Sequence, residues 1–451
     1  MSIRRIIVLD IVGLSTRHFQ YENRLPNITN LVKTGKVAKL IPDFPCVTCT
    51  VQASMLSGTH PNKHGVICNG YYDRKTQKTI FWGRPYTLVQ THRIWDIIKS
   101  KREDYVTAVI FWQQTMGANS DIVITPKPKH HRTGETISWC YTKPSGYYEE
   151  LVKAYGDFPL MNYWGPMASI NSSQWIIKAA IHTLKRFSPN LMLVYIPHLD
   201  YSAQRYGPEN PRTLSELTEV DNLVGEILDA LEDLKLLEET AIMLVSEYGF
   251  TDVSDAVSPN VILRDSGMLN IKLVDGKEHI DFSSTKAFAM VDHQIAHVFV
   301  SNPYIEEVRS ILESADGVKE VLDEDGKREK YLDHPLSGEL VAISEENRWF
   351  AYYWWNDPSK APDFARTVDI HRKPGFDPLE LFFEENTKSI PLEPKLVKGS
   401  HGYPPYSDAQ KATFVLSCDN LDFSLKEEVH CTQVAPTIAK LLGIEHHFDL
   451  A

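Results

Sequence analysis

Apolar and polar positions follow two different periods along the chain. Four short apolar runs have the length and composition of buried strands, and three longer stretches repeat apolar residues every three or four positions, as amphipathic helices do. The strand-like runs are residues 4–9, 105–111, 191–196 and 241–245, and the helical stretches are residues 26–34, 172–187 and 214–236. Strands that alternate with helices predict an α/β layered fold with a mostly parallel central sheet.

Two stretches interrupt this alternation. Residues 113–165 are rich in proline, lysine, threonine, histidine and glycine, which predicts a long functional loop. Residues 252–395 combine several short strands, one of them expected across residues 290–300, with runs of aromatic residues. We therefore expect residues 1–251 and 396–451 to form the α/β core and residues 252–395 to form an inserted cap.

The composition narrows the class of protein. The chain has 451 residues, 43% of them hydrophobic, and its 47 Lys and Arg against 59 Asp and Glu give a net charge of −12. This acidic balance argues against nucleic acid polymers and anionic membranes as partners. No apolar run approaches the ~18 residues of a membrane helix, and the first apolar run is too short for the core of a signal peptide. We therefore expect a cytoplasmic protein without a membrane anchor.

Acidic side chains follow three of the predicted strands. Asp10 comes directly after the first strand, Asp200 lies shortly after the third, and Glu247 follows the fourth. Because the carboxyl ends of parallel strands meet at one edge of a sheet, these carboxylates should converge and predict a metal centre. Each residue alone has a simpler alternative, since a strand-end aspartate is often a turn residue or a helix cap.

A segment with hydroxyl and thiol groups precedes a short helix predicted at residues 50–56. Thr48 lies between Cys46 and Cys49. A hydroxyl at the start of a helix sits where free backbone N–H groups and the helix dipole favour an anion, although Thr48 or Thr50 could equally cap the helix. The two cysteines form a lone C-x-x-C pair, which gives little support to a zinc knuckle or a redox centre.

Several motifs resemble a known superfamily. Residues 57–66, SGTHPNKHGV, resemble the T-G-x-x-P-x-x-H-G block of the alkaline phosphatase superfamily, and the chain is most similar to its type I phosphodiesterase/nucleotide pyrophosphatase branch. Further blocks follow in the family's order. They are residues 206–208 (YGP), 246–249 (SEYG, where the family has S-D-H-G), 398–403 (KGSHGY, like G-T-H-G-Y) and 435–439 (APTIA). The agreement extends from residue 6 to residue 443, whereas the predicted cap matches poorly.

This resemblance implies an alkaline phosphatase-like α/β/α sandwich with a two-metal site for phosphoryl transfer. Thr48 aligns with the nucleophile, which forms a covalent phospho-enzyme intermediate, and Asn69 aligns with an asparagine that holds a non-bridging phosphoryl oxygen. By position, the first metal ion would be held by Asp10, Thr48, Glu247 and Tyr248, and the second by Asp200, Gln204 and His401.

The expected metal ligands depart from the family's pattern. Glu247 and Tyr248 replace an Asp-His pair, and Gln204 replaces a histidine, so that His401 is the one imidazole left in the set. The resemblance implies two zinc ions, but oxygen ligands suit Mg²⁺, Mn²⁺ or Ca²⁺ better than zinc. Either one metal ion binds, or another histidine supplies a ligand. The candidates are His198, His293 and His297.

The motifs together favour a metal-dependent hydrolase. Its substrate would be a small-molecule phosphate ester with a phosphodiester or nucleotide-type pyrophosphate bond. One alternative is a phosphomonoester or phosphonate hydrolase on the same site, because one fold supports many reactions. The other is a degenerate member of the family that binds a ligand without turnover. We expect substrate selectivity to depend on the cap and on the long loop.

Overall fold

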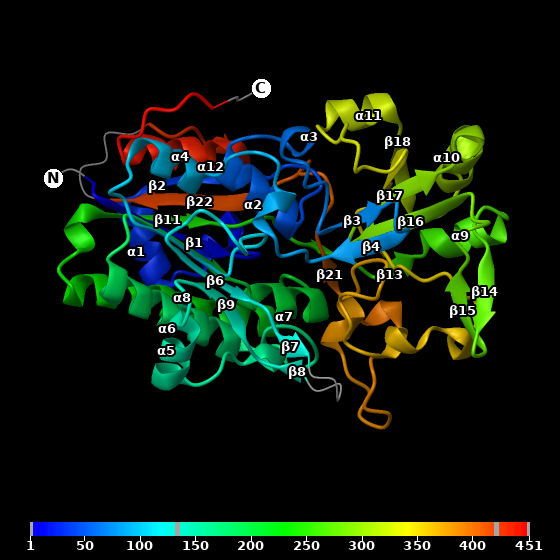
Figure 1. The fold of residues 1–451 in the computed structure, drawn as a ribbon, viewed down its shortest axis with the longest axis horizontal. Coiled ribbons are helices and arrows are strands. Elements are labelled where there is room, and N and C mark those ends of the chain that lie inside the picture. The colour runs from blue at the N-terminus through cyan, green and yellow to red at the C-terminus, as the bar shows by residue number, and fades with distance from the viewer. Residues whose placement is uncertain (1–2, 131–135, 419–423, 449–451) are drawn as a thin grey trace.

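A nine-stranded sheet runs through the larger lobe of the molecule (Figure 1). The computed structural model describes residues 3–130, 136–418 and 424–448. The strand order is β23-β2-β22-β11-β1-β10-β5-β6-β9, and β22 and β9 run against the other strands described in this sheet. In that order the strands are Glu428–His430, Lys36–Ile41, Ala412–Ser417, Thr240–Val245, Arg5–Ile11, Leu191–Ile196, Thr107–Ile110, Ile122–Pro126 and Cys140–Lys143. The mostly parallel sheet predicted from the sequence is confirmed.

Three central strands form the middle of this sheet. β1 pairs in parallel with β10 on one side and with β11 on the other, and every residue of the three strands is buried. Their nearly continuous apolar sequences are typical of strands covered on both faces. β1 extends beyond the predicted end at residue 9, because Asp10 and Ile11 continue the pairing with β10.

Helices cover both faces of the sheet (Figure 1). α1, α5, α6, α7 and α8 lie on one face, and α2, α4 and α12 lie on the other, which makes the lobe an α/β/α sandwich. In chain order the helices of this lobe are α1 Pro26–Thr34, α2 Thr48–Ser57, α3 Pro61–His64, α4 Ile94–Lys101, α5 Tyr147–Tyr155, α6 Ile170–Phe187, α7 His198–Tyr206, α8 Pro211–Asp233 and α12 Val434–Leu441. None of the helices in the described part of the chain is both long and apolar enough to cross a membrane.

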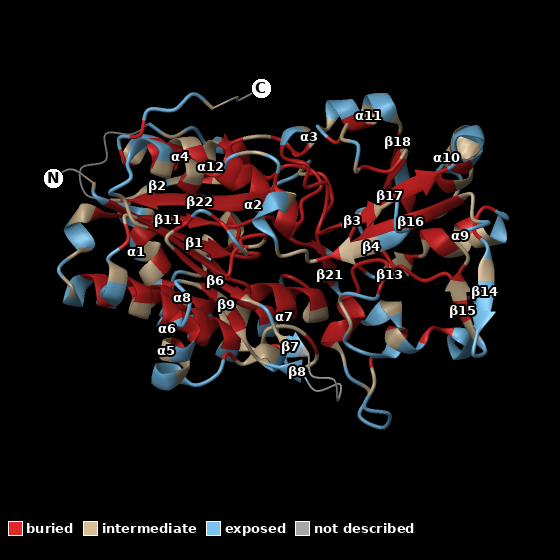
Figure 2. Cartoon of the chain, in the orientation of Figure 1, coloured by how far each residue is buried: buried red, intermediate tan, exposed pale blue. Residues whose placement is uncertain are grey.

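A second lobe has its own sheet and its own hydrophobic core (Figure 2). Its antiparallel sheet has the order β16-β17-β19-β18, with helices and two hairpins around it. These elements are β3 Gly70–Asp73, β4 Lys78–Phe81, α9 Pro259–Asp265, β14 Ile271–Val274, β15 Lys277–Ile280, β16 Ala287–Asp292, β17 Ile295–Val300, α10 Ile305–Glu313, β18 Val318–Leu322, α11 Glu324–Glu329 and β19 Leu340–Ser344. Phe44, Val47 and Ile67 also pack into this core, so early parts of the chain contribute to it. The cap boundaries at residues 252 and 395 stay a prediction.

Short two-stranded ladders complete the structure. They are β7 Lys129–His130 with β8 Thr136–Ile137, β12 Thr251–Asp252 with β21 Gly399–Ser400, and β13 Asp255–Val257 with β20 Arg348–Phe350. The ladder of β12 and β21 links the chain on either side of the second lobe, since Thr251 pairs with Ser400.

Two stretches differ from the expectation. Residues 113–165 are not one long loop, because they contribute β6 and β9 to the large sheet and also form α5. The short apolar run at residues 122–124 is sufficient for a strand beside β5. Residues 290–300 are not one strand but parts of the hairpin β16–β17, which turns at His293 and Gln294. Polar residues at the turn interrupt the apolar pattern there.

A buried carboxylate holds α1 against α8. Asp221 of α8 is fully buried and accepts hydrogen bonds from the backbone N–H groups of Asn27 and Ile28, at 3.1 and 2.8 Å. Both N–H groups belong to the first turn of α1, where a helix leaves its donors unpaired and where its dipole favours a negative charge.

Asp221→Ala should lower the free energy of unfolding by about 2–3 kcal/mol, because two buried N–H groups lose a charged acceptor. Urea denaturation of the full chain measures this change. Asp229 is exposed on the same helix, and Asp229→Ala is the matched control, with an expected change of less than about 0.5 kcal/mol. Equal stability losses in the two variants would contradict the role of Asp221.

Candidate active site

Three carboxylates meet at the carboxyl ends of the central strands. Asp10 is the last residue but one of β1, Asp200 lies in the first turn of α7 directly after β10, and Glu247 follows β11. All three side chains are buried, and among the described residues no lysine or arginine forms an ion pair with them. The parallel register brings these residues to one edge of the sheet, as expected from the strand ends.

Thr48 faces this edge from the first residue of α2, a helix that is buried along its whole length. The Thr48 hydroxyl lies 3.1 Å from the hydroxyl of Tyr248, which donates to Asp200 Oδ1 at 3.2 Å. Thr48 therefore lies between the acidic strand ends and a helix N-terminus, where unpaired N–H groups favour an anion.

Gln52 joins two of the carboxylates, a role that the sequence alone did not indicate. Its Nε2 donates to Asp10 Oδ2 at 3.1 Å and to Glu247 Oε1 at 2.7 Å. The second oxygens of these groups, Asp10 Oδ1 and Glu247 Oε2, are buried and have no hydrogen-bond partner in the described part of the chain. Gln52 could have been found from its spacing in the sequence, because a residue four positions after Thr48 lies on the same face of a helix.

Asp200 accepts hydrogen bonds on both of its oxygens. Gln204, one turn later on α7, donates from Nε2 to Asp200 Oδ2 at 2.7 Å and leaves its own Oε1 buried without a partner among the described residues. His401 Nε2 lies 3.8 Å from Asp200 Oδ1, and His401 Nδ1 donates to the Cys46 carbonyl at 2.8 Å. Because the carbonyl holds the proton on Nδ1, the lone pair of Nε2 faces the site.

Burial shifts the pKa values of these groups toward their neutral forms. It raises the pKa of Asp10 to about 7 and the pKa of Asp200 to about 7. Burial and the neighbouring Asp10 hold the pKa of Glu247 well above its usual range. Burial also lowers the pKa of His401 and raises the pKa of Tyr248. Neither a neutral His401 nor an ion-paired lysine or arginine among the described residues therefore gives these carboxylates a positive partner.

Asn69 lies beside Thr48 and is held by the second lobe. Its Oδ1 accepts a hydrogen bond from the backbone N–H of Cys49 at 2.9 Å. Its own N–H and its Nδ2 donate to Asp292 at 2.8 and 3.2 Å. Asp292 is buried, and burial raises its pKa to about 6. The amide of Asn69 keeps a second hydrogen that a ligand can accept.

Four aromatic rings form a column between the two lobes. Tyr248 stacks on His401 with centroids 3.5 Å apart, His401 lies 3.6 Å from His293, and His293 stacks on Phe376 at 3.7 Å. His293 Nδ1 is 2.7 Å from Asp292, and His293 Nε2 is buried without a partner among the described residues. His293 also has a φ of 59°, at a hairpin position that usually favours glycine. Such strain is often found at functional sites.

A cavity of about 540 Å³ opens onto these residues. The polar residues that line it include Thr48, Asp200, Gln204, Tyr248, His293 and His401, and the aromatic ones include Trp82, Tyr163, Trp164 and Phe376. Arg84 and His371 also line it, with the guanidinium of Arg84 3.3 Å from His371 Nε2. Its volume is within the range of small-molecule sites, and both lobes contribute to its walls.

Residues 6–377 match the family model of type I phosphodiesterase/nucleotide pyrophosphatase. The chain belongs to the type I phosphodiesterase/nucleotide pyrophosphatase family. Among curated relatives, an uncharacterized pyrophosphatase/phosphodiesterase of Schizosaccharomyces pombe is 20% identical over 69% of this chain and 56% of its own length. The human ectonucleotide pyrophosphatase/phosphodiesterase family member 1 is 24% identical over 56% of this chain and 24% of its own length. The chain thus spans between about a quarter and just over half of these relatives.

Solved structures of related proteins share the fold. Murine ectonucleotide pyrophosphatase/phosphodiesterase 5 is 15% identical, with a TM-score of 0.62 over 98% of this chain and 95% of that one. The human protein of the same name is 15% identical, with a TM-score of 0.63 over 98% of this chain and 96% of that one. A further structure holds the inactive murine protein, with an alanine in place of a threonine, in complex with AMP. These matches confirm the alkaline phosphatase-like fold that the motifs predicted.

The family's metal ions can be compared with the residues present. At the first expected position, the buried oxygens Asp10 Oδ1 and Glu247 Oε2 have no partner in the described part of the chain, and a divalent cation would satisfy both. At the second, His401 Nε2 and Gln204 Oε1 remain available beside Asp200. These residues fit divalent cations, and their many oxygen atoms suit Mg²⁺ or Mn²⁺ at least as well as zinc. The number and identity of the ions stay a prediction.

Tyr248 fits the expected ligand set less well. Its hydroxyl is already 3.1 Å from the Thr48 hydroxyl and donates to Asp200, and burial raises its pKa, so it is a neutral hydrogen-bonding group in this structure. Its role as a metal ligand stays a prediction. The ring of Tyr248 has a clear packing role, because it supports His401.

The three histidines considered as replacement ligands have different places. His293 lines the cavity. His198 Nε2 is 2.6 Å from Glu219 of α8, which is a contact between helices. Both ring nitrogens of His297 meet the backbone, with Nε2 3.2 Å from the Ile67 carbonyl and Nδ1 accepting from Gly338 N–H at 3.3 Å. Of the three, His293 is the one that lies beside the expected ligands.

The pair of cysteines around Thr48 consists of buried thiols. Burial raises the pKa of both Cys46 and Cys49 well above the usual value, which disfavours the reactive thiolate. Cys46 belongs to the core of the larger lobe, so the two side chains act as small packing groups beside the helix start.

Without metal ions, the protein should lose stability as the pH rises from about 4 to about 7. The pKa of Asp200 is raised from 3.8 to about 7 in the folded protein, so the folded state binds more protons than the unfolded state in this interval. Asp200→Asn removes this group from the titration and should reduce the pH dependence. Urea denaturation of both proteins with a chelator present, at several pH values, measures the effect. If the stabilities of the parent and of Asp200→Asn changed with pH in the same way, Asp200 would already be ionised in the folded protein over this interval.

Gln204→His should increase the affinity for zinc relative to Mn²⁺, because an imidazole replaces an amide beside Asp200 and His401. Competition titrations of the metal-free protein measure the preference. Gln20 is exposed and lies outside the site, so Gln20→His is the matched control for an added histidine. Identical metal preferences in parent and variant would exclude Gln204 from the ligand set.

Proposed function

We propose that this chain is a metal-dependent hydrolase that cleaves a phosphodiester or nucleotide-type pyrophosphate bond, with Thr48 as the nucleophile. Membership of the family supports this class of reaction. The observation that carries the proposal is the place of the Thr48 hydroxyl, which lies at the N-terminus of a buried helix, borders the cavity and is 3.1 Å from Tyr248.

In the proposed reaction, the Thr48 oxygen attacks phosphorus, the bond to the leaving oxygen breaks, and a phospho-threonine forms. Water then attacks this intermediate and releases the phosphorylated product. Asn69 Oδ1 already accepts the Cys49 N–H, and the other N–H groups at the start of α2, together with the remaining hydrogen of Asn69 Nδ2, stabilise the non-bridging oxygens. Tyr248 orients the Thr48 hydroxyl through their hydrogen bond. Bound divalent cations would lower the pKa of that hydroxyl and stabilise the leaving oxygen.

The proposed ligand set follows the expected positions. Asp10, Thr48 and Glu247 would hold one cation, with Tyr248 beside them, and Asp200, Gln204 and His401 would hold the other. Support comes from three buried oxygen atoms that have no hydrogen-bond partner among the described residues: Asp10 Oδ1, Glu247 Oε2 and Gln204 Oε1. In the described residues, no lysine or arginine side chain pairs with these buried carboxylates. A bound cation would therefore stabilise their ionised forms.

The cavity favours a small substrate with an aromatic group. Trp82, Tyr163 and Trp164 offer ring faces or edges for a base or sugar, and Arg84 offers a positive charge for a second phosphate. A relative, human ENPP4, is named a bis(5'-adenosyl)-triphosphatase, and a structural neighbour binds AMP. Both names support a nucleotide-type phosphate ester as the substrate of this chain.

Ligand binding without turnover is a second candidate function. One observation favours it: hydrogen-bond donors from Gln52, Tyr248 and Gln204 already reach carboxylate oxygens of the expected metal ligands. Because these donors already stabilise the carboxylates, the site would require fewer bound cations than the two that the resemblance implies. A panel of phosphodiester, pyrophosphate, phosphomonoester and phosphonate substrates separates this candidate from the hydrolases.

Thr48→Ala should abolish hydrolysis of bis-(4-nitrophenyl) phosphate, because the substitution removes the hydroxyl that the proposed mechanism uses as the nucleophile. Thr50→Ala is the matched control, since the Thr50 hydroxyl is buried in the same helix and has no partner in the described part of the chain. Circular dichroism checks the fold of both variants. Unchanged turnover in Thr48→Ala would exclude Thr48 as the nucleophile.

Elemental analysis of the parent protein, with the same assay run with and without a chelator, tests the metal requirement. Bound divalent metal and chelator-sensitive turnover are the expected results. Absence of turnover in the presence of Zn²⁺, Mn²⁺ and Mg²⁺ would favour the binding protein instead.

A further inference from the structure

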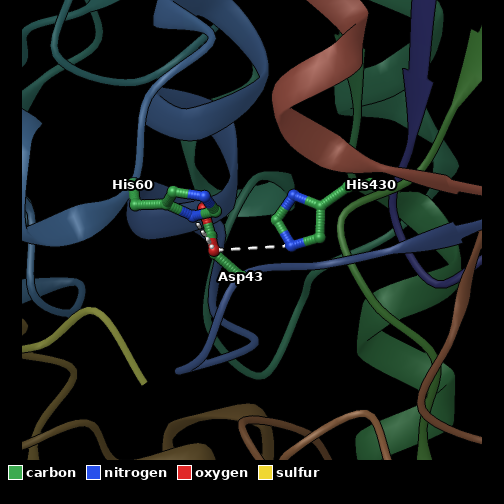
Figure 3. Close-up of side chains that lie close together, drawn as sticks. All are labelled: Asp43, His60 and His430. Carbon is green, nitrogen blue, oxygen red and sulfur yellow. Dashed lines mark hydrogen bonds and ion pairs between the residues drawn. The ribbon is translucent and has the colours of Figure 1, made fainter. Parts of the chain in front are cut away.

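A second group of metal-ligating side chains lies outside the active site. Asp43 follows β2 by two residues, His430 is the last residue of the neighbouring strand β23, and His60 precedes α3 (Figure 3). β2 and β23 run in parallel with Ile41 opposite His430, so the sheet places Asp43 and His430 at the same edge. The three residues therefore converge from separate parts of the chain.

Their geometry is close to that of a metal site. Asp43 Oδ1 lies 2.8 Å from His60 Nδ1 and 3.6 Å from His430 Nε2, and the three ligand atoms lie within 4.8 Å of one another. The side chains of Asp43 and His60 are 3% and 8% exposed, whereas that of His430 is 32% exposed and gives access from solvent. Small outward shifts of these atoms would create the distances of about 2 Å that a bound ion requires.

We propose that Asp43, His60 and His430 bind a divalent transition-metal ion, with zinc preferred. Two imidazoles and one carboxylate form a common donor set for zinc, and they leave a fourth position for water. Asp43 Oδ2 is buried and has no hydrogen-bond partner in the described part of the chain, so a second carboxylate oxygen is available. No lysine or arginine pairs with Asp43 among the described residues, and its ion pairs are with the two histidines.

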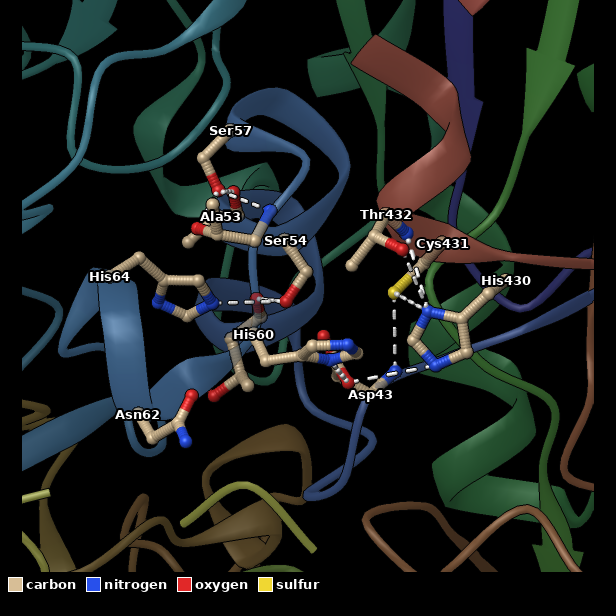
Figure 4. Close-up of polar contacts among 12 residues, drawn as sticks. Asp43, Ala53, Ser54, Ser57, His60, Asn62, His64, His430, Cys431 and Thr432 are labelled. Carbon is tan, nitrogen blue, oxygen red and sulfur yellow. Dashed lines mark hydrogen bonds and ion pairs between the residues drawn. The ribbon is translucent and has the colours of Figure 1, made fainter. Parts of the chain in front are cut away.

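The surroundings of the cluster orient the two imidazoles (Figure 4). His430 Nδ1 accepts a hydrogen bond from the Thr432 backbone N–H at 3.4 Å and lies 3.1 Å from the Thr432 hydroxyl, so that without an ion the ring proton is on Nε2, on the side of Asp43. Binding of an ion to Nε2 would move that proton to Nδ1, where the Thr432 hydroxyl can accept it. The ring of His60 stacks on Tyr331 with centroids 3.9 Å apart and an interplanar angle of 7°. When an ion binds, it takes the place of the proton that His60 and Asp43 share, and that proton passes to solvent.

A thiol lies beside the cluster without joining it. Cys431 Sγ accepts a hydrogen bond from the backbone N–H of Asp43 at 3.3 Å and lies 3.9 Å from His430 Nδ1. Burial raises the pKa of this thiol well above its usual value. Cys431 therefore holds the backbone of Asp43 in place, and the three ligands remain two imidazoles and one carboxylate.

The position of the cluster gives the ion a structural role. Asp43 lies five residues before Thr48, and His60 lies three residues after the end of α2. A bound ion would therefore tie both ends of the segment that carries Thr48 to the sheet edge at His430. This role is separate from that of the cations proposed at Asp10 and Asp200.

Zinc titration of the metal-free full chain, with dialysis and elemental analysis, tests the proposal. His430→Gln should lose one equivalent of bound zinc, while Glu247→Gln, which alters the proposed active site, should keep that equivalent. His92 is exposed, and His92→Gln is the matched control for the loss of a histidine. Co²⁺ in place of zinc should give a visible ligand-field spectrum whose intensity falls in His430→Gln but not in His92→Gln.

Equal zinc content in the parent and in His430→Gln would overturn the proposal, as would a Co²⁺ spectrum unchanged by that substitution. If His430→Gln does not fold, X-ray absorption at the zinc edge of a double variant, Glu247→Gln with Asp200→Asn, which alters both proposed active-site positions, provides the second measurement. It should show two imidazoles and oxygen ligands, and a shell without imidazole would also overturn the proposal. The two proposals can fail separately. If the parent protein shows no phosphodiesterase turnover but His430→Gln still loses one equivalent of zinc, the proposed function is contradicted and the proposed zinc site is supported.

Discussion

The burial of three carboxylates at one edge of a sheet is the constraint on which the rest of the site depends. Parallel pairing of β1 with β10 and β11 brings Asp10, Asp200 and Glu247 together, away from solvent and from basic side chains. Ionised carboxylates in such a place are unfavourable unless donors or cations surround them. The amides of Gln52 and Gln204 and the hydroxyl of Tyr248 supply donors, and the oxygens that they leave unpartnered define where cations would bind.

The central sheet and the polar strand ends could be predicted from the sequence, because they depend on local patterns. Strands such as residues 191–196 are apolar throughout, and Asp200 follows at a fixed distance along the chain. The place of Thr48 at a helix start was also visible from its neighbours. The bridge by Gln52 was harder to predict, because it depends on α2 facing two strands at once. The hydrogen bonds between Asn69 and Asp292 could not be predicted from the sequence, because 223 positions separate the two residues along the chain.

The fold is shared with distant relatives, whereas one motif of the site departs from the pattern that the sequence resembles. This chain and murine ectonucleotide pyrophosphatase/phosphodiesterase 5 are 15% identical but align over nearly their whole lengths. The motif that should read S-D-H-G reads SEYG here, and its two altered residues have connected roles. Glu247 meets the amide of Gln52, and the ring of Tyr248 lies flat against His401. Both residues at which this chain departs from the S-D-H-G pattern therefore have defined contacts within the site.

The column of rings from Tyr248 to Phe376 also has a mechanical consequence. Tyr248 belongs to the core of the larger lobe and Phe376 to the core of the smaller one, and the rings of His401 and His293 lie in contact between them. A hinge motion that opened the lobes would separate these rings and expose their faces to water, which costs free energy. The column therefore acts as a strut that keeps the lobes at a fixed separation.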